Sequence, residues 1–161
     1  MQKITPCLWF NTNAEEAVKY YMSVFPKAKT GKVLHYDDES AKVSGQKKGS
    51  VLTMDFTIGG MTFVAMNNGP LFKFSQATSF MIDCKTQKEV DHYWFALSKG
   101  GQQQPCGWVV DKFGVTWRVV PSQLTTLLMS KDAKKAQRVM HVMLQMKKLD
   151  IGKLQQAYEG K

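Results

Sequence analysis

The stretch that decides the fold is residues 106–121, which read CGWVVDKFGVTWRVVP. Two apolar runs flank a four-residue turn from Asp111 to Gly114, and Asp and Gly are residues that tight turns favour. After the turn, apolar side chains alternate with Thr116 and Arg118. Because successive side chains of a strand point to opposite faces, the stretch predicts a β-hairpin with one core face and one polar face.

A strand and a helix are predicted in front of this hairpin. Residues 79–84 read as a strand, and Thr86 with Glu89 forms a capping-box pattern that opens a helix. Gly100-Gly101 ends that helix. The order is therefore strand, helix and then antiparallel strands.

The first half of the chain shows the same order. A strand is predicted over 4–10, and a capping box at Thr12–Glu15 or Asn13–Glu16 opens a helix that stops at Pro26. The sequence next predicts a strand over 30–36, a flexible polar loop over 37–49 and a hairpin over 51–66 that turns at Gly59-Gly60. Two βαβββ modules are thus expected.

The residues after Pro121 predict helices only. A short helix is expected over 123–129, a second after Ser130 or Asp132, and a third after Asp150. A methionine stripe on the second helix indicates packing against the body of the protein or a partner subunit rather than a cofactor site.

Composition narrows the functional classes. The chain has 161 residues, 43% of them hydrophobic, which suits one domain, and no apolar run is long enough for a membrane helix. The N-terminus runs straight into a strand, so we expect no signal peptide. Three cysteines without paired spacing predict no disulfide framework and a cytoplasmic location. The net charge is +9, but the lysines are spread, which argues against nucleic-acid binding.

The expected fold is α+β, with the paired βαβββ modules forming a curved mixed sheet around a cleft, plus C-terminal helices. We predict a single domain over 1–161, with module one at about 1–68, a linker at about 69–77, module two at about 78–121 and a helical tail at about 122–161.

Strand alternation and nearby aromatic residues predict the side chains that line the cleft: Thr5, Cys7, Trp9, Thr53, Asp55, Ser79, Met81, Trp108 and Arg118. Hydroxyls, acids, an arginine and aromatic walls suit a small polar or anionic ligand. The guanidinium of Arg118 would hold a carboxylate or phosphate by two parallel hydrogen bonds. The alternatives are a salt bridge from Arg118 to Asp55 or Asp83, and a cleft filled by Trp9 and Met81.

Several stretches together carry a resemblance to a known family: TPCLWF at 5–10, DHYW at 91–94 and the hairpin at 106–121. The chain resembles the PhnB-like family, labelled 3-demethylubiquinone-9 3-methyltransferase. That family lies in the glyoxalase/bleomycin-resistance/extradiol dioxygenase (vicinal-oxygen-chelate) superfamily. The resemblance covers nearly the whole chain, including the tail, and implies a homodimer.

The same resemblance places the four metal-ligand positions of metal-using relatives at Thr5, Thr53, Ser79 and Arg118. None of these is a usual metal ligand, so we expect no metal and no cofactor, although Asp55 and Cys7 lie one strand step away. The chain's histidines are expected at surface or packing positions: His35, His92 and His141.

The methyltransferase label finds no support in the residues. A usual methyl-donor site needs a glycine-rich loop between a strand and a helix of a doubly wound sheet. Gly59-Gly60 lies in a hairpin and Gly100-Gly101 follows a helix.

The sequence therefore predicts a metal-free, cytoplasmic, dimeric protein that binds a small molecule. The alternative is an enzyme of the superfamily, of lyase, isomerase or dioxygenase type, with a metal at non-standard ligands. A third interpretation is an interaction module that uses its basic tail helices.

Overall fold

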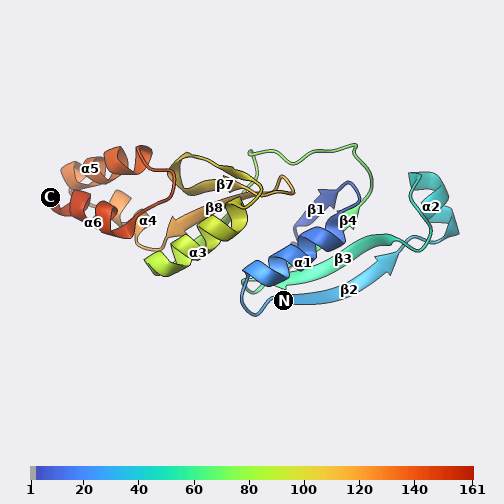
Figure 1. Ribbon diagram of the computed structural model, residues 1–161. Helices are drawn as coiled ribbons and strands as arrows, with labels where there is room; N and C mark the ends of the chain where they lie inside the picture. Colours follow the sequence, from blue (N-terminus) through green and yellow to red (C-terminus); the bar gives the residue numbers. More distant parts are fainter. Residues whose placement is uncertain (1–2) are drawn as a thin grey trace. The chain divides into compact units, whose positions relative to one another are not determined.

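The computed structural model describes residues 3–161 and divides the chain into two compact units, one ending at Phe74 and the other running over Ser75–Lys161 (Figure 1). Each unit contains one four-stranded mixed sheet with helices, which confirms the expected α+β class and the internal repeat. The unit boundary falls inside the stretch expected to be the linker. The cleft between the modules stays a prediction.

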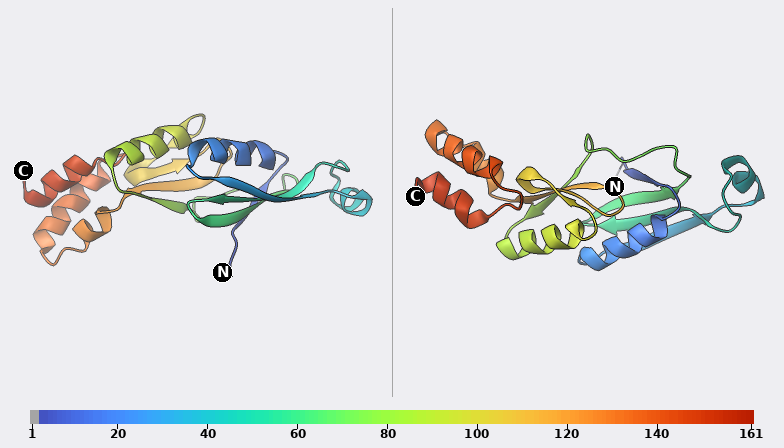
Figure 2. Two further views of the ribbon diagram at one scale, coloured as in Figure 1. Left: turned by 90° about the horizontal axis from the view of Figure 1, so that it is seen from below. Right: turned by 45° about the horizontal axis from the view of Figure 1, so that its top comes forward.

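The first unit has the sheet order β1-β4-β3-β2, with β1 parallel to β4 and the other pairs antiparallel. Helix α1 packs against β3 and β4 on one face of the sheet (Figure 2). The elements are β1 (Cys7–Phe10), α1 (Ala14–Val24), β2 (Lys29–His35), α2 (Asp38–Ser44), β3 (Val51–Ile58) and β4 (Met61–Asn67).

Aromatic rings form the core between α1 and this sheet. Tyr21 stacks on Phe56 with ring centroids 5.7 Å apart, and Phe56 stacks on Phe63 at 5.1 Å. Leu8 and Phe10 are buried on the same side. The alternation predicted for β1 and β3 is therefore confirmed, and it leaves the other face of the sheet for polar side chains.

The predicted local cap of α1 is wrong. Asn13 occupies the N-cap position without a side-chain hydrogen bond. The free N–H of Ala14 instead donates to Oδ1 of Asn67, at the end of β4, over 2.8 Å. Asn67 Nδ2 donates in turn to the Glu15 carboxylate (2.8 Å) and to the Val51 carbonyl (3.1 Å). A residue 53 positions away therefore satisfies the helix end.

Two further predictions for this unit need correction. The first strand begins at Cys7 rather than Ile4, which is 85% exposed, so the preceding residues leave the sheet. The supposed loop over 37–49 contains α2, because Asp37 and Ser40 form a capping box and Gly45 ends the helix in the left-handed conformation.

The second unit repeats the topology with the order β5-β8-β7-β6, and β5 pairs in parallel with β8. Helix α3 packs on this sheet as α1 does on the first, and its predicted capping box of Thr86 and Glu89 is present. The elements are β5 (Phe80–Cys84), α3 (Gln87–Ser98), β6 (Gln102–Gln103), the 3₁₀ turn η1 (Pro105–Gly107), β7 (Trp108–Val110) and β8 (Thr116–Pro121).

The predicted hairpin is confirmed, and a buried carboxylate holds its turn. Asp111 is 3% exposed. Its Oδ1 accepts the N–H groups of Phe113 (2.9 Å) and Val115 (3.0 Å), while its Oδ2 accepts the indole N–H of Trp117 (2.8 Å). The turn therefore fixes a core residue as well as the strand direction.

The tail is part of the second unit, with helices α4 (Leu124–Leu128), α5 (Ala133–Leu144) and α6 (Ile151–Glu159). Its buried residues form a cluster with the end of β8: Val120, Leu124, Leu127, Val139, Leu149 and Leu154. The N–H groups of Cys106 and Gly107 donate to the carbonyls of Met146 and Lys147, each over 2.8 Å. Within residues 3–161, the structure contains no helix with the length and apolar character needed to cross a bilayer.

Of the methionine stripe, Met143 and Met146 pack on this cluster. Met140 is 41% exposed. The packing interpretation therefore accounts for two of the three methionines.

Candidate functional site

The residues predicted for the site divide between the two units, so each half is described on its own sheet. The first unit carries Thr5, Cys7, Trp9, Thr53 and Asp55, and the second carries Ser79, Met81, Trp108 and Arg118.

In the first unit, the strand register brings four of the five residues onto the sheet face opposite α1. Cys7 pairs with Val64, which pairs with Asp55, and Trp9 pairs with Met66, which pairs with Thr53. Paired residues share a face, so the two rows lie side by side. Thr5 is exposed and precedes β1, so it does not belong to either row.

Trp9 and Cys7 contribute surface to this face rather than reactive groups. The indole N–H of Trp9 donates to the Gly69 carbonyl over 2.9 Å, and the Phe72 ring meets the indole edge-on at 4.9 Å. Burial raises the pKa of the Cys7 thiol above its ordinary value. A raised pKa keeps the thiol protonated, and a protonated thiol is a poor nucleophile.

In the second unit, three of the four predicted residues form one row across the sheet. Met81 on β5 pairs with Arg118 on β8, and Arg118 pairs with Trp108 on β7. The Arg118 Cζ lies 4.9 Å from the Trp108 ring centroid, within cation–π range. Met81 is 60% exposed, and Ser79 is half-buried just before β5.

Two donors on β8 have no partner in residues 3–161. They are Nε of Arg118 and Oγ1 of Thr116, both buried atoms. Thr116 as a residue is only 2% exposed. Alternation along β8 places both side chains on the face opposite α3. Buried polar groups without partners are uncommon, so a ligand or water is expected to satisfy them.

The suggested salt bridge partner Asp83 is engaged elsewhere. Its Oδ2 accepts the Ser122 hydroxyl over 2.8 Å. That contact leaves Arg118 oriented by Trp108.

A hollow of about 340 Å³ lies against Trp108, lined by Gln76, Gln104, Pro105, Cys106 and Trp108. Two amides and a thiol give it polar groups beside an indole wall. Cys106 has a φ of 57°, a left-handed conformation that is uncommon for residues other than glycine.

Sequence reasoning missed Gln76, Gln104 and Cys106 as lining residues. Only Cys106 carried a signal, because it opens the hairpin stretch. The two glutamines lie in loops, where strand alternation says nothing.

The donor set does not fit the metal site that metal-using relatives have. Thr5, Thr53 and Ser79 offer only hydroxyls, and Arg118 brings a positive charge. Among residues 3–161, no three His, Cys, Asp or Glu side chains come together.

The family of the chain follows from a match to a known family model. The family model described as 3-demethylubiquinone-9 3-methyltransferase matches residues 2–120. The chain belongs to this family. The two mixed sheets of the chain also repeat the strand order that the resemblance implied.

Among solved structures, the chain is similar to a PhnB protein from Bacillus cereus, described as a 3-demethylubiquinone-9 3-methyltransferase. The identity is 30% and the TM-score 0.63, over 74% of this chain and 99% of that one. A protein from Pseudomonas aeruginosa is 21% identical with a TM-score of 0.61, over 75% and 98% of the two chains. No curated protein matches.

The match of the PhnB-like family ends where the tail begins. About three quarters of this chain covers nearly all of both structures, and the family model stops at residue 120. The family resemblance expected for the tail thus lies outside the matched residues.

Proposed function

We propose that the chain binds a small anionic molecule on the face of its second sheet opposite α3, without a metal. The observation that carries the proposal is the buried, unpartnered Nε of Arg118 beside Trp108. Two oxygens of a carboxylate or phosphate would accept from Nε and from a neighbouring guanidinium nitrogen, a two-point contact that arginine makes well.

Neighbouring groups support the same ligand class. The hydroxyl of Thr116, two residues along β8, supplies a second buried donor. The hollow beside Trp108 offers room for the uncharged part of a small molecule, with amides to bind its oxygens.

The family description does not set the reaction. Within residues 3–161, Gly59 and Gly60 form the β3–β4 turn, and Gly100 follows α3 in the left-handed conformation. Neither pair lies between a parallel strand and its following helix, where a usual methyl donor binds. We therefore propose binding, and propose no methyl transfer.

Thermal shift and calorimetry with small mono- and dicarboxylates and organic phosphates test the anion site. Arg118→Met should weaken binding of the best ligand about thirtyfold, the effect of losing charged hydrogen bonds. Arg118→Lys should weaken binding less, because lysine keeps the positive charge but lacks the planar guanidinium that makes two parallel hydrogen bonds. Lys88→Met, on the exposed surface of α3, is the matched control. Equal affinities in all four proteins would refute the proposal.

Metal analysis of the purified protein tests whether the site works without a metal. We expect no stoichiometric zinc, manganese, nickel or iron. A tightly held metal would favour the alternative, an enzyme of the superfamily with non-standard ligands, and its removal should then abolish ligand binding.

We further propose a homodimer in the reducing cytoplasm. The superfamily resemblance supports the dimer, and three free cysteines support the compartment: Cys7, Cys84 and Cys106. Light scattering should give twice the mass of the chain, and a monomer at all concentrations would contradict this.

A further inference from the structure

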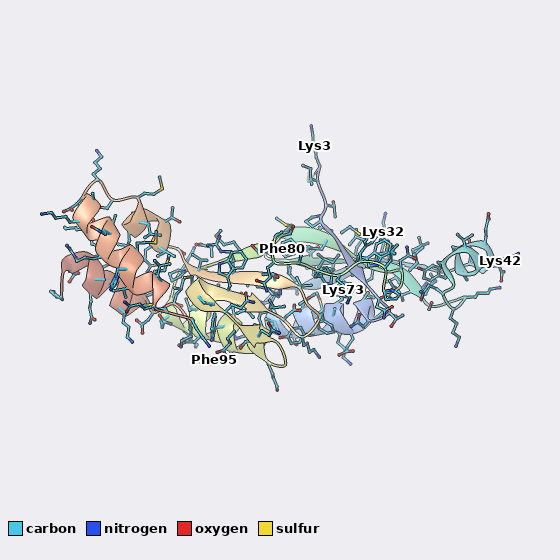
Figure 3. The ribbon with its side chains drawn as sticks, turned by 90° about the horizontal axis from the view of Figure 1, so that it is seen from above. Lys3, Lys32, Lys42, Lys73, Phe80 and Phe95 are labelled. Carbon is cyan, nitrogen blue, oxygen red and sulfur yellow. The ribbon has the colours of Figure 1, made fainter. Side chains whose placement is uncertain are left out.

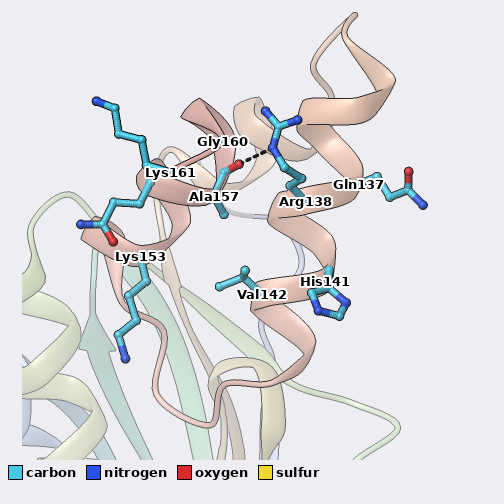
Figure 4. A pocket seen from close by; sticks show the side chains of 9 residues that line it. Gln137, Arg138, His141, Val142, Lys153, Ala157, Gly160 and Lys161 are labelled. Atoms are coloured by element: carbon cyan, nitrogen blue, oxygen red, sulfur yellow. Dashed lines mark hydrogen bonds between the residues drawn. The ribbon is translucent and has the colours of Figure 1, made fainter.

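A groove of about 680 Å³ lies between α5 and α6 in the tail (Figure 4). Val142 and Ala157 provide apolar groups. Arg138 and His141 line it from α5, and Lys153 and Lys161 line it from α6 and just beyond. It is a basic groove with an apolar component.

Arg138 is fixed in place at this groove. Its Nε donates to the Ala157 carbonyl and its Nη2 to the Tyr158 carbonyl, both over 2.8 Å. Both carbonyls belong to the last turn of α6, and that of Ala157 also accepts the N–H of the C-cap residue Gly160 over 3.3 Å. The bonds lock α5 to α6 and hold a positive charge at the groove, so little side-chain freedom is lost when a ligand binds.

The tail concentrates the positive charge of the chain. Residues 131–161 contain eight Lys or Arg against three Asp or Glu, while the net charge of the whole chain is +9. Asp132 and Asp150 cap α5 and α6, and Glu159 pairs with Lys161. The acidic groups of the tail are thus engaged within it, and of the basic groups that line the groove, Lys161 shares its charge with Glu159.

Apolar side chains continue beside the groove. Met140 and Leu144 lie one helical turn apart on α5 and are 41% and 61% exposed. Helical spacing puts Leu144 on the same side of α5 as Gln137, which lines the groove about two turns away. A partner that covers this surface would need apolar groups as well as negative charge.

We infer that this groove docks an acidic amphipathic helix of another protein. Carboxylates on such a helix would meet Lys153 and His141 and would compete with Glu159 for Lys161, while its apolar side chains would cover Val142 and Leu144. The tail lies beyond the matched family domain, so the inference is independent of the anion site on the second sheet.

A second copy of the chain offers no such segment. Its densest acidic run is Asp37–Glu39 on α2, where Asp37 caps the helix and Asp38 pairs with Lys48 over 2.7 Å. Basic side chains are otherwise spread over separate elements, and Figure 3 shows Lys3 and Lys42 extending away from the ribbon. Single-stranded nucleic acid is disfavoured because the groove lining contains no Phe, Tyr or Trp ring on which bases would stack.

Fluorescence anisotropy with the full chain tests this inference. The probe is a labelled peptide of about four helical turns, about 16 residues, with glutamates on one face and leucines on the other. The double variant Lys153→Glu/Lys161→Glu should bind it roughly tenfold more weakly, as expected from two lost charge contacts of modest strength. Unchanged melting temperature shows that the variant is folded.

The matched control is Lys19→Glu/Lys88→Glu, which changes the net charge equally at exposed positions on α1 and α3. It should bind the peptide like the wild type, and a peptide of the same composition in scrambled order should bind weakly. Equal loss in both double variants would overturn the inference, because it would show general charge attraction. No binding of the peptide, or tighter binding of duplex DNA with the same dependence on Lys153 and Lys161, would overturn it too.

Discussion

Helices α1 and α3 occupy the same place in two units of the same topology, yet their first turns are held by different means. Thr86 and Glu89 cap α3 from within its own sequence. Asn67 caps α1 from the far end of β4 and binds Glu15 and Val51 as well. A local cap stabilises one helix, whereas Asn67 ties a helix, a strand end and a neighbouring strand into one core.

The sheet faces that lie opposite α1 and α3 also differ in their chemistry. The first carries Asp55 and threonines, and the second carries Arg118 against Trp108. The second unit also extends its core into the tail, through Leu149 and Leu154. The two units therefore share a topology but differ in the side chains on these faces and in the elements that complete their cores.

The largest expected effect comes from Leu149→Ala, which removes a fully buried side chain of the tail. We expect a loss of about 4 kcal/mol in the free energy of unfolding. Leu144→Ala, at a 61% exposed site on α5, is the control and should change little. Hydrogen exchange resolved by residue should show the loss in the second unit and not in the first. Equal loosening of both units would show that they do not hold separate cores.

Asn67→Ala is the next test, and it acts on the first unit. It removes the acceptor of the Ala14 N–H and the amide donor to the Val51 carbonyl and to Glu15, so we expect a loss of about 3 kcal/mol by chemical denaturation. Asn67→Asp keeps the acceptor for Ala14 but puts a carboxylate beside Glu15, and an intermediate loss is expected. If both variants match the wild type, Asn67 is not the cap that the distances indicate.

Thr86→Ala should cost less, because only the local cap of α3 is lost. The expected change is about 1 kcal/mol. Thr86→Ser keeps the hydroxyl and should retain most of the stability. A loss as large as that of Asn67→Ala would remove the contrast between the two helix ends.

The smallest effect concerns the contact between α3 and the tail. Lys148 hydrogen-bonds to Asp91, and this contact, followed by that of Gln87, lowers the pKa of the Asp91 carboxyl below its ordinary value of 3.8. Because the pKa of Asp91 is lower in the folded chain than in the unfolded chain, the stabilisation is fully present above the unfolded-state pKa. It is lost as the pH falls through the folded-state pKa. The stability difference between wild type and Lys148→Met should therefore shrink in acid, and a difference independent of pH would contradict it.

Sequence patterns predicted what depends on neighbours in the chain. The alternation of β8, the capping box at Thr86 and the caps at Asp132 and Asp150 are all local, and all were found. The cap by Asn67 and the anchoring of Gly107 on Lys147 join distant residues, and no local pattern marks them. For the site, alternation placed Arg118 beside Trp108 and Met81, but it was silent on Gln76 and Gln104, which lie in loops.

The dependence of the second unit on Leu149 and Leu154 has a consequence for how the chain is made. Translation delivers the first unit complete once Phe74 has left the ribosome, and domains commonly fold in that order during synthesis. Val120 at the end of β8 stays without the apolar side chains of Leu149 and Leu154 until residue 154 has emerged. Nascent chains stalled between these points should expose an apolar surface that chaperones recognise, and the first unit should already resist protease in them.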